Sequence, residues 1–474
     1  MSGPLSNPFM FNSAADDFYD HQIAQSCRFD QGSTSYLYRT QGTGSSQKIW
    51  TFSTWFKKGK LITTTAQNPL IFSGAQAGGT NHGGLFLDSA KGGDLRPFNY
   101  TSSFDFDLRT TAVYRDYSAW YHVVMRVDTT QGASGDRVRL YVNGEQVTAF
   151  DTESQPSLNF DTAFGIDSTV MYVGDATGSD SFDGYMAETI FTDGQSYAPT
   201  QFGEDKNGVW IPKDPSGTTF GDNGFHLKYE SSGDLGNDSS GNNNDFTASG
   251  LGADHQMLDT PTFDSSSNGG NFCTWNPLDR YNYNPPSEGN LRALTNGNNG
   301  TQTATFGASS GKWYFEARNG TAGSETVARL IGIMKVPTDM SATPYNNSDC
   351  YLYYSGDGNI YNGGNQGSYG DSWQTDGDKI GVAIDLDNGA MWFSKNGTWQ
   401  NSATKGEIEA GTTTNAAFTS LSGDYKIMVT KTGGTSSNDP HDANFGQDDT
   451  FAGTDTGTAG PYADSTGYGS FYYD

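Results

Sequence analysis

The stretch that decides the fold reads GDKIGVAIDLDNGAMWFSKNGTW and covers residues 377–399. Two runs of apolar and β-branched residues in it each lead into an Asn-Gly pair, at Asn388-Gly389 and Asn396-Gly397. Asn and Gly tolerate the positive φ angles that the tight turns of β-hairpins require. The stretch therefore predicts antiparallel strands joined by two consecutive hairpin turns.

The same pattern recurs outward along the chain. RVRLYVNGEQV, residues 137–147, places another Asn-Gly pair between two such runs. In YHVVMRVD, residues 121–128, Tyr121, Val123, Met125 and Val127 alternate with more polar residues, as in a strand with one buried face. We find no amphipathic helix longer than two turns, so we predict an all-β chain of antiparallel strands; the resemblances given below imply that these form two jelly-roll-type β-sandwiches in series.

Composition restricts the function classes. The 474 residues are too many for one ordinary core. A net charge of −27 repels phosphate backbones, so we expect no nucleic-acid partner. Cys27, Cys273 and Cys350 are too far apart for a metal motif and odd in number, so we expect buried thiols. No run is long and apolar enough to insert in a membrane.

Changes in composition along the chain suggest five parts. The polar stretch GDLGNDSSGNNNDFTASG, residues 233–250, predicts a linker, and the Gly- and Tyr-rich end predicts a flexible or partner-ordered tail. The expected parts are an arm (1–25), a first sandwich (26–232), a linker (233–270), a second sandwich (271–452) and a tail (453–474).

Four segments of the first sandwich carry a family resemblance. They read SCRFDQGSTSYLYRT (26–40), WTFSTWFKKG (50–59), SAWYHVVMRVD (118–128) and YVGDATGSDSFDGYMAETIFTDG (172–194). In this order they resemble the laminin G-like jelly rolls of the concanavalin A superfamily. The resemblance implies two packed sheets, with Trp55, Trp120, Tyr121, Leu140 and Met186 in the core or between the sheets.

The second sandwich resembles a SPRY domain. The opening stretch, GKWYFEARNG (311–320), RLIGIMKV (329–336) and NFGQ (444–447) carry this resemblance. It implies a protein-interaction module that binds through loops at one end. The Gly- and Tyr-rich loops of this chain carry no peptide-binding signature that identifies the partner class.

A laminin G-like domain followed by a SPRY domain looks like the arrangement in virion proteins of marine tailed bacteriophages. Residues 1–20 have neither the basic start nor the apolar stretch of a secretory signal, which agrees with release by lysis. The resemblance implies a non-enzymatic virion protein, homo-oligomeric in the particle, that contacts other virion proteins and a host-surface glycan or protein. A tail fibre or appendage, a receptor-binding adhesin and a capsid decoration protein all remain open, with a laminarinase-type enzyme or an intracellular adaptor as alternatives.

We expect no enzyme activity. Laminarinase-type chemistry needs alternating carboxylates such as E-x-D-x-x-E on one strand, and the nearest string, EIEAG at residues 407–411, lacks the central Asp. GASSG, residues 307–311, matches a nucleophile elbow but precedes a strand, so we expect a turn. The six histidines show no zinc-binding spacing, and we expect His122 and His226 to be hydrogen-bonded structural residues.

Calcium is the one cofactor that the sequence suggests. Asp175, Asp180 and Asp183 lie in one loop, GDATGSDSFDG, and supply the oxygen ligands that Ca²⁺ prefers. Many laminin G-like relatives bind calcium near such loops. The alternative is that these aspartates end strands and form Asx turns.

Two further groups are candidates for contacts with partners. Aromatic residues in the Gly-rich segment after Cys350 are candidate ligand-binding groups, expected at the surface: Tyr354, Tyr361, Tyr369 and Trp373. The alternative is that half of them fold back onto the sandwich. The apolar string LSNPFMF of the arm, residues 5–11, is a candidate attachment segment through Pro8, Phe9, Met10 and Phe11. Packing on its own first domain is the alternative for this string.

Overall fold

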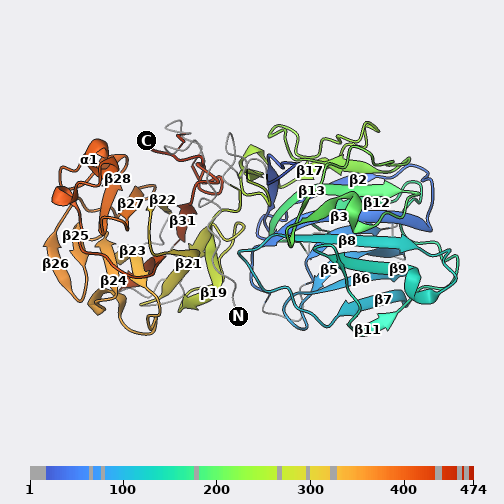
Figure 1. Cartoon of the computed structure of the whole chain (residues 1–474), viewed down its shortest axis with the longest axis horizontal. Coiled ribbons are helices and arrows are strands. Elements are labelled where there is room, and N and C mark those ends of the chain that lie inside the picture. The colour runs from blue at the N-terminus through green and yellow to red at the C-terminus, as the bar shows by residue number, and fades with distance from the viewer. Residues whose placement is uncertain are drawn as a thin grey trace. The chain divides into compact units, whose positions relative to one another are not determined.

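The chain forms two compact units, Met1–Asn271 and Phe272–Asp474, in a computed structural model (Figure 1). No helix among the described residues is long and apolar enough to cross a membrane. The structure describes residues 18–62, 68–75, 81–175, 181–263, 270–294, 299–320, 328–432, 440–455, 462–463 and 469–474.

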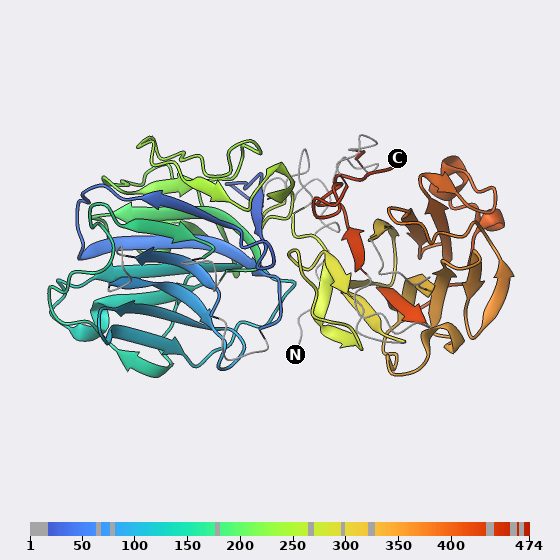
Figure 2. The same ribbon diagram turned by 180° about the vertical axis from the view of Figure 1, so that it is seen from behind.

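The first unit contains two large antiparallel sheets (Figures 1 and 2). The first sheet has the order β10 (Glu145–Gln146), β9 (Val138–Val142), β8 (Tyr121–Asp128), β3 (Ile49–Lys58), β13 (Gly184–Asp193), β1 (Ser26–Phe29) and β18 (Gln256–Met257), with β16 (Phe225–Leu227) also on β13. The second has the order β11 (Phe150–Ser154), β7 (Phe104–Thr110), β6 (Asp94–Tyr100), β5 (His82–Asp88), β4 (Leu70–Ala75), β12 (Val170–Val173), β2 (Tyr36–Thr40) and β17 (Thr247–Ser249). A separate hairpin pairs β14 (Gly203–Lys206) with β15 (Val209–Pro212).

The core of this unit lies between its two sheets. Phe52 of β3 stacks on Phe72 of β4 with ring centroids 4.2 Å apart. The alternation predicted for β8 is confirmed, because Val123, Met125 and Val127 all enter this core. Leu140 and Met186 also lie in it, and Tyr121 packs partly buried against it.

Trp55 is a buried core residue, as predicted, but it and the partly buried Trp120 pack outside the space between the two sheets. Successive side chains of a strand point to opposite faces, so Trp55 lies on the face of β3 opposite Phe52. There Trp55, Trp120 and Trp210 join Ile23 and Ala187 in a cluster separate from the inter-sheet core. Both faces of β3 carry aromatic residues, so the sequence did not show which face lies between the sheets.

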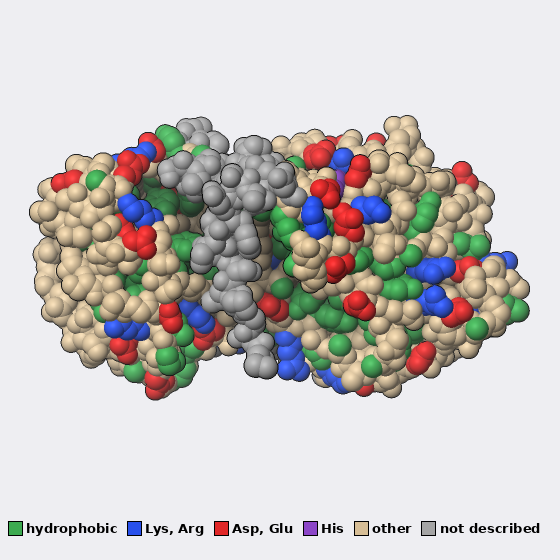
Figure 3. Space-filling model, in the orientation of Figure 1, with side chains coloured by type: hydrophobic (Ala, Val, Ile, Leu, Met, Phe, Trp, Pro, Cys, Tyr) green, Lys and Arg blue, Asp and Glu red, His purple; other side chains and the backbone are tan. Residues whose placement is uncertain are grey.

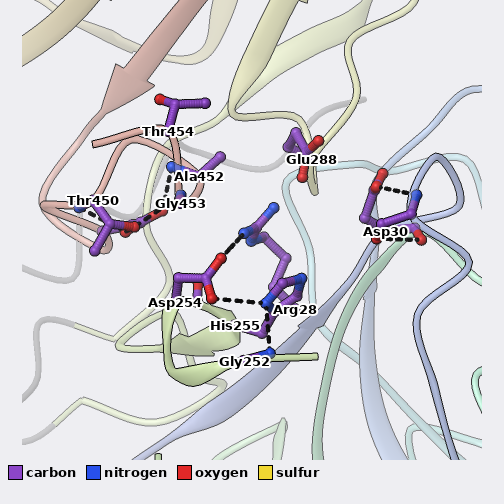
Figure 4. Close-up of polar contacts among 12 residues, drawn as sticks. Arg28, Asp30, Gly252, Asp254, His255, Glu288, Thr450, Ala452, Gly453 and Thr454 are labelled. Atoms are coloured by element: carbon purple, nitrogen blue, oxygen red, sulfur yellow. Dashed lines mark hydrogen bonds and ion pairs between the residues drawn. The ribbon is translucent and has the colours of Figure 1, made fainter. Parts of the chain in front are cut away.

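The predicted linker is wrong for most of its length, because its described residues fold into the first unit. β17 pairs with β2, and β18 pairs with β1. Leu235 and Phe246 are core residues. The polar side chains satisfy backbone groups, as where Asn244 Nδ2 donates to the carbonyl of Gly224 at 2.8 Å. Figure 4 shows Asp254 and His255 of the same segment beside Arg28 of β1.

The second unit is also a two-sheet sandwich. One sheet has the order β19 (Trp275–Tyr281), β21 (Thr301–Ala308), β30 (Tyr425–Thr432), β23 (Ala328–Lys335), β24 (Cys350–Tyr354), β25 (Asn359–Tyr361) and β26 (Asn365–Ser368). The other has the order β20 (Arg292–Leu294), β31 (Pro440–Asn444), β22 (Lys312–Asn319), β27 (Lys379–Asp385), β28 (Ala390–Lys395) and β29 (Thr398–Trp399). Tyr353 of β24 stacks on Phe393 of β28 at 5.0 Å and so joins the two sheets.

Both hairpins predicted from the opening stretch are confirmed. Asp385 pairs with Ala390 across the first, and Lys395 pairs with Thr398 across the second. In the second turn Asn396 and Gly397 have φ angles of 48° and 79°, as a type I′ turn requires. The all-β prediction is confirmed: α1 (Lys405–Glu409) is the single α-helix of the described residues.

Of the tail that we expected to be flexible or ordered by a partner, the structure describes residues 453–455, 462–463 and 469–474. Phe471 and Tyr472 are buried, and the backbone of Phe471 pairs with that of Tyr462. The aromatic side chains provide apolar area that outweighs the Gly-rich composition of the segment. All three cysteines are buried free thiols, as predicted.

Candidate functional site

A pocket open to solvent lies in the first unit, where the end of β3 passes the segment that precedes β13. It is shallow: only about 10 Å³ is open to the centre of a water-sized sphere, which is room for about one water molecule, and the rest is open to solvent. Its lining combines polar and apolar side chains: Gln31, Lys58, Lys60, Leu61, Ile62, Pro69, Leu87, Ser181, Phe182 and Asp183. We call this the rim pocket.

Close backbone packing brings the two sides of the rim pocket together. The N–H of Gly59 donates to the carbonyl of Asp183 at 2.9 Å. A Cβ at Gly59 would lie 2.2 Å from Asp183 Oδ1, and one at Gly184 would lie 2.2 Å from the Lys57 carbonyl. Glycine is therefore required at both positions, which hold Lys58 and Lys60 beside Asp183.

Hydrogen bonds position the polar groups of the pocket. Lys60 Nζ donates to Gln31 Oε1 at 2.7 Å, and the Lys60 N–H donates to Asp183 Oδ1 at 3.0 Å. Lys58 Nζ donates to the carbonyl of Tyr114 at 2.9 Å. Burial lowers the pKa of Lys58 to about 8, with a smaller contribution in the same direction from Arg115.

The polar groups of this arrangement could bind one hydroxyl of a neutral ligand that lies mainly outside the pocket, since the pocket itself has room for about one water molecule. Ammonium, amide and carboxylate groups can exchange hydrogen bonds with hydroxyls, and the apolar side chains can cover a ring face that has no polar atoms. Gln31, Lys58 and Lys60 were not predicted as site residues, because they are distant along the chain from Asp183, the pocket residue that the sequence did indicate. The run FKKGK at residues 56–60 was the available signal.

The predicted calcium residues do not form a complete ligand set in the described structure. Asp175 is fully buried, and its Oδ2 accepts from Ser181 Oγ at 2.9 Å. Asp183 lines the rim pocket and accepts backbone N–H groups, while Asp180 lies outside the described residues. No group of three metal-ligating side chains gathers among the described residues. Calcium binding stays a prediction from the sequence.

The structure divides the four predicted aromatic ligand residues. Tyr354 and Tyr361 are half-buried and form an edge-to-face pair with centroids 5.6 Å apart. Tyr369 and Trp373 are buried, so the expectation that they lie at the surface is wrong. Both pack against Tyr353 in the second unit, because the Gly-rich segment folds back onto the sandwich.

The attachment residues Pro8, Phe9, Met10 and Phe11 lie outside the described residues. The described structure begins at Phe18, where the arm already contacts the first unit. Ile23 N–H donates to Thr262 Oγ1 at 2.8 Å, and His21 Nε2 lies 3.4 Å from Glu188 Oε1. The attachment role stays a prediction.

The carboxylates of EIEAG have a structural explanation. They lie in α1 rather than in the loop that we expected, and Glu407 Oε2 accepts from the Thr404 N–H at 2.9 Å in a capping box. GASSG spans the turn between β21 and β22, as predicted.

The two strand histidines are hydrogen-bonded, also as predicted. His122 bonds Ser53 Oγ and Trp210 Nε1, while His226 bonds Glu188.

Comparisons with known proteins support both units. A family model for the concanavalin A-like lectin/glucanases superfamily matches residues 31–194, and a SPRY domain model matches residues 312–425. The crystal structure of the SPRY domain of human HERC1 is 18% identical, with 36% of this chain and 96% of that chain covered and a TM-score of 0.29. Another human SPRY domain is 19% identical, with 32% and 90% covered and a TM-score of 0.24. From the two family models, the chain carries a laminin G-like, concanavalin A-like domain followed by a SPRY domain, in the order that the sequence predicts.

Proposed function

We propose that this chain is a non-enzymatic binding protein of a tailed-phage virion, and that its first domain binds a host-surface glycan in the rim pocket. The glycan assignment rests on the lining of the rim pocket, where hydrogen-bonding groups of Lys60, Gln31 and Asp183 lie beside apolar side chains. The domain that contains this pocket matches the concanavalin A-like lectin/glucanases superfamily. A pyranose presents hydroxyls at its edge, so one hydroxyl could exchange hydrogen bonds with these hydrogen-bonding groups while the ring lies at the mouth of the pocket.

The surface charge supports a neutral rather than a phosphate-rich ligand. The chain carries 54 acidic against 27 basic residues. On the face in Figure 3, the coloured Lys and Arg side chains lie near acidic ones and form no continuous basic patch. Such a surface repels polyanions at long range but leaves hydrogen bonding to a neutral sugar unaffected.

The glycan assignment is tested with the full chain on an array of host-surface glycans. Wild type is compared with Gln31→Ala plus Lys60→Ala, and with Lys213→Ala, an exposed lysine of the same unit outside the pocket. We expect the double variant to lose about tenfold or more in affinity, because two hydrogen-bonding groups are removed, and the control to bind as wild type. Equal binding of all three proteins would contradict the pocket assignment.

The virion assignment rests on the order of the two domains and needs its own test. Mass spectrometry of purified particles should find the chain, and gold-labelled antibodies should place it on the tail or the head. We expect deletion of residues 2–17 to leave both domains folded by circular dichroism and to prevent incorporation. If purified particles lack the chain, the virion assignment is wrong. The glycan site would still be tested independently by the array.

A further inference from the structure

The last six residues, GSFYYD (469–474), lie against the second unit as a bound peptide would. The N–H groups of Tyr472 and Tyr473 donate to the two oxygens of the Glu316 carboxylate, each at 2.8 Å. The Ser470 N–H donates to the Gly446 carbonyl at 2.7 Å, and Asn444 Nδ2 donates to the Ser470 carbonyl at 2.8 Å. Three residues of the peptide, Ser470, Tyr472 and Tyr473, are therefore held through their backbone.

Glu316 is an unusual residue to find at the centre of these contacts. It lies on β22 with its side chain on the face opposite Phe315, and it is completely buried. The groups that donate to its carboxylate are all neutral: the two tail N–H groups, Tyr314 Oη and Asn444 Nδ2. Burial raises the pKa of Glu316, and these hydrogen bonds act in the opposite direction. The tail thus supplies two of the four donors that stabilise the carboxylate.

Side-chain contacts select aromatic residues at two positions of the peptide. The Phe471 ring packs edge-to-face on Tyr314 with centroids 5.0 Å apart. The Tyr473 ring lies directly over Gly397, where an added Cβ would come within 2.7 Å of Cδ1. The glycine that the hairpin turn requires also leaves room for this ring.

Two lysine side chains contact the peptide, at Tyr472 and at Asp474. Lys379 Nζ lies 4.1 Å from the centroid of the Tyr472 ring, and Lys405 forms an ion pair with Asp474. We define the tail groove by Tyr314, Glu316, Lys379, Gly397, Lys405 and Asn444.

We propose that the tail groove is a peptide-binding site, and that it takes the C-terminal hexapeptide of a second copy of this chain as well as its own. Residues 456–468 separate the hexapeptide from Asp455, and within them Tyr462 exchanges two backbone hydrogen bonds with Phe471. If Tyr462 moves with the hexapeptide, the six residues 456–461 form the connection and can span about 20 Å when extended; if the pairing with Phe471 breaks, all thirteen residues can span about 45 Å. An exchange of identical segments between copies creates a link without any new contact, and high local concentration favours it over self-occupation.

The first test adds the hexapeptide to the full-length chain. A fluorescein-labelled GSFYYD peptide is titrated into a chain with Phe471→Ala plus Tyr473→Ala, which weakens its own tail, and into wild type. We expect saturable binding to the variant and binding about tenfold or more weaker to wild type, whose groove is occupied. No binding to the folded variant would overturn the proposal.

A matched peptide isolates the Glu316 contact without altering the protein. N-methylation of the amides that correspond to Tyr472 and Tyr473 removes both donors and keeps every side chain. We expect this peptide to bind about tenfold or more weakly, because hydrogen bonds to a charged group are lost. Equal binding of the methylated peptide would refute the role of Glu316, even if Glu316→Gln fails to fold.

The second test addresses exchange between copies. The tail-weakened chain is mixed with a full-length chain carrying Glu316→Gln, in which the groove is impaired and the tail is intact. Sedimentation velocity should show a heterodimer in the mixture at concentrations where each variant alone is monomeric. If Glu316→Gln fails to fold, Lys405→Glu, which reverses the charge opposite Asp474 at an exposed position, replaces it. Two unmixed monomers would overturn the second-copy part of the proposal, even where the free peptide binds.

Discussion

Replacing Asp259 with alanine should destabilise the first unit strongly. Asp259 Oδ2 lies 2.7 Å from Lys57 Nζ, and the side chains of both residues are fully buried. Lys57 Nζ also donates to Asn271 Oδ1 at 2.8 Å, and Trp120 Nε1 donates to Asp259 Oδ1 at 3.0 Å. Asp259 comes from the segment that composition assigned to a linker, so its contribution measures whether that segment belongs to the domain.

The expected loss of unfolding free energy arises because Asp259→Ala leaves the Lys57 ammonium buried without the Asp259 carboxylate. Removing one partner of a buried ion pair costs about 3–5 kcal/mol. A unit of 271 residues has an unfolding entropy of roughly 0.57 kcal/mol per kelvin. The first melting transition should therefore fall by about 5–9 °C in differential scanning calorimetry.

Two controls make this result specific. Asp234→Ala, at an exposed acidic residue of the same segment, should change the unfolding free energy by no more than about 0.5 kcal/mol. Lys57→Met combined with Asp259→Leu removes both charges and should recover most of the loss. A fall below about 1 kcal/mol for Asp259→Ala would refute the view that residues 233–263 are part of the domain core.

Three other predictions concern pH, catalysis and calcium. Burial lowers the pKa of His122 to about 3, so the unfolded chain takes up this proton before the folded chain as pH falls. Stability should then decrease by about 1.4 kcal/mol per pH unit between about pH 6.5 and 3, and His122→Gln should remove that part of the slope in urea titrations. The purified chain should release no reducing ends from laminarin, agarose or host capsular polysaccharide, whereas release abolished by Glu407→Gln or Glu409→Gln would show an enzyme. If the calcium prediction from the sequence holds, EGTA should lower the first melting transition only, and Asp175→Ala plus Asp183→Ala should cancel the difference; an identical melt with and without EGTA would contradict it.

Local patterns predicted the strands and turns because the responsible forces are local. The positive φ angles at Asn396 and Gly397, and the alternation that buries Val123 and Met125, depend on residues adjacent in the chain. The order of the two domains could also be predicted from such segments. Composition failed where polar side chains satisfy backbone groups, as Asn244 does in the segment taken for a linker.

The site was less predictable because distant segments build it. Asp183 was singled out for its neighbours in sequence, but its partner Lys60 is more than 120 residues away. Trp373 was expected at the surface because it lies in a Gly-rich segment, but it is buried against Tyr353, which precedes it by twenty residues. Sequence could suggest which residue types matter but not which of them meet.

A crystal structure of the chain with the strongest glycan from the array tests the central claim most directly. The account predicts a sugar at the mouth of the rim pocket, with hydroxyls within hydrogen-bond distance of Lys60 Nζ and Gln31 and a ring face against the partly exposed Leu61. A glycan bound elsewhere on either domain, with the rim pocket holding only water, would contradict it.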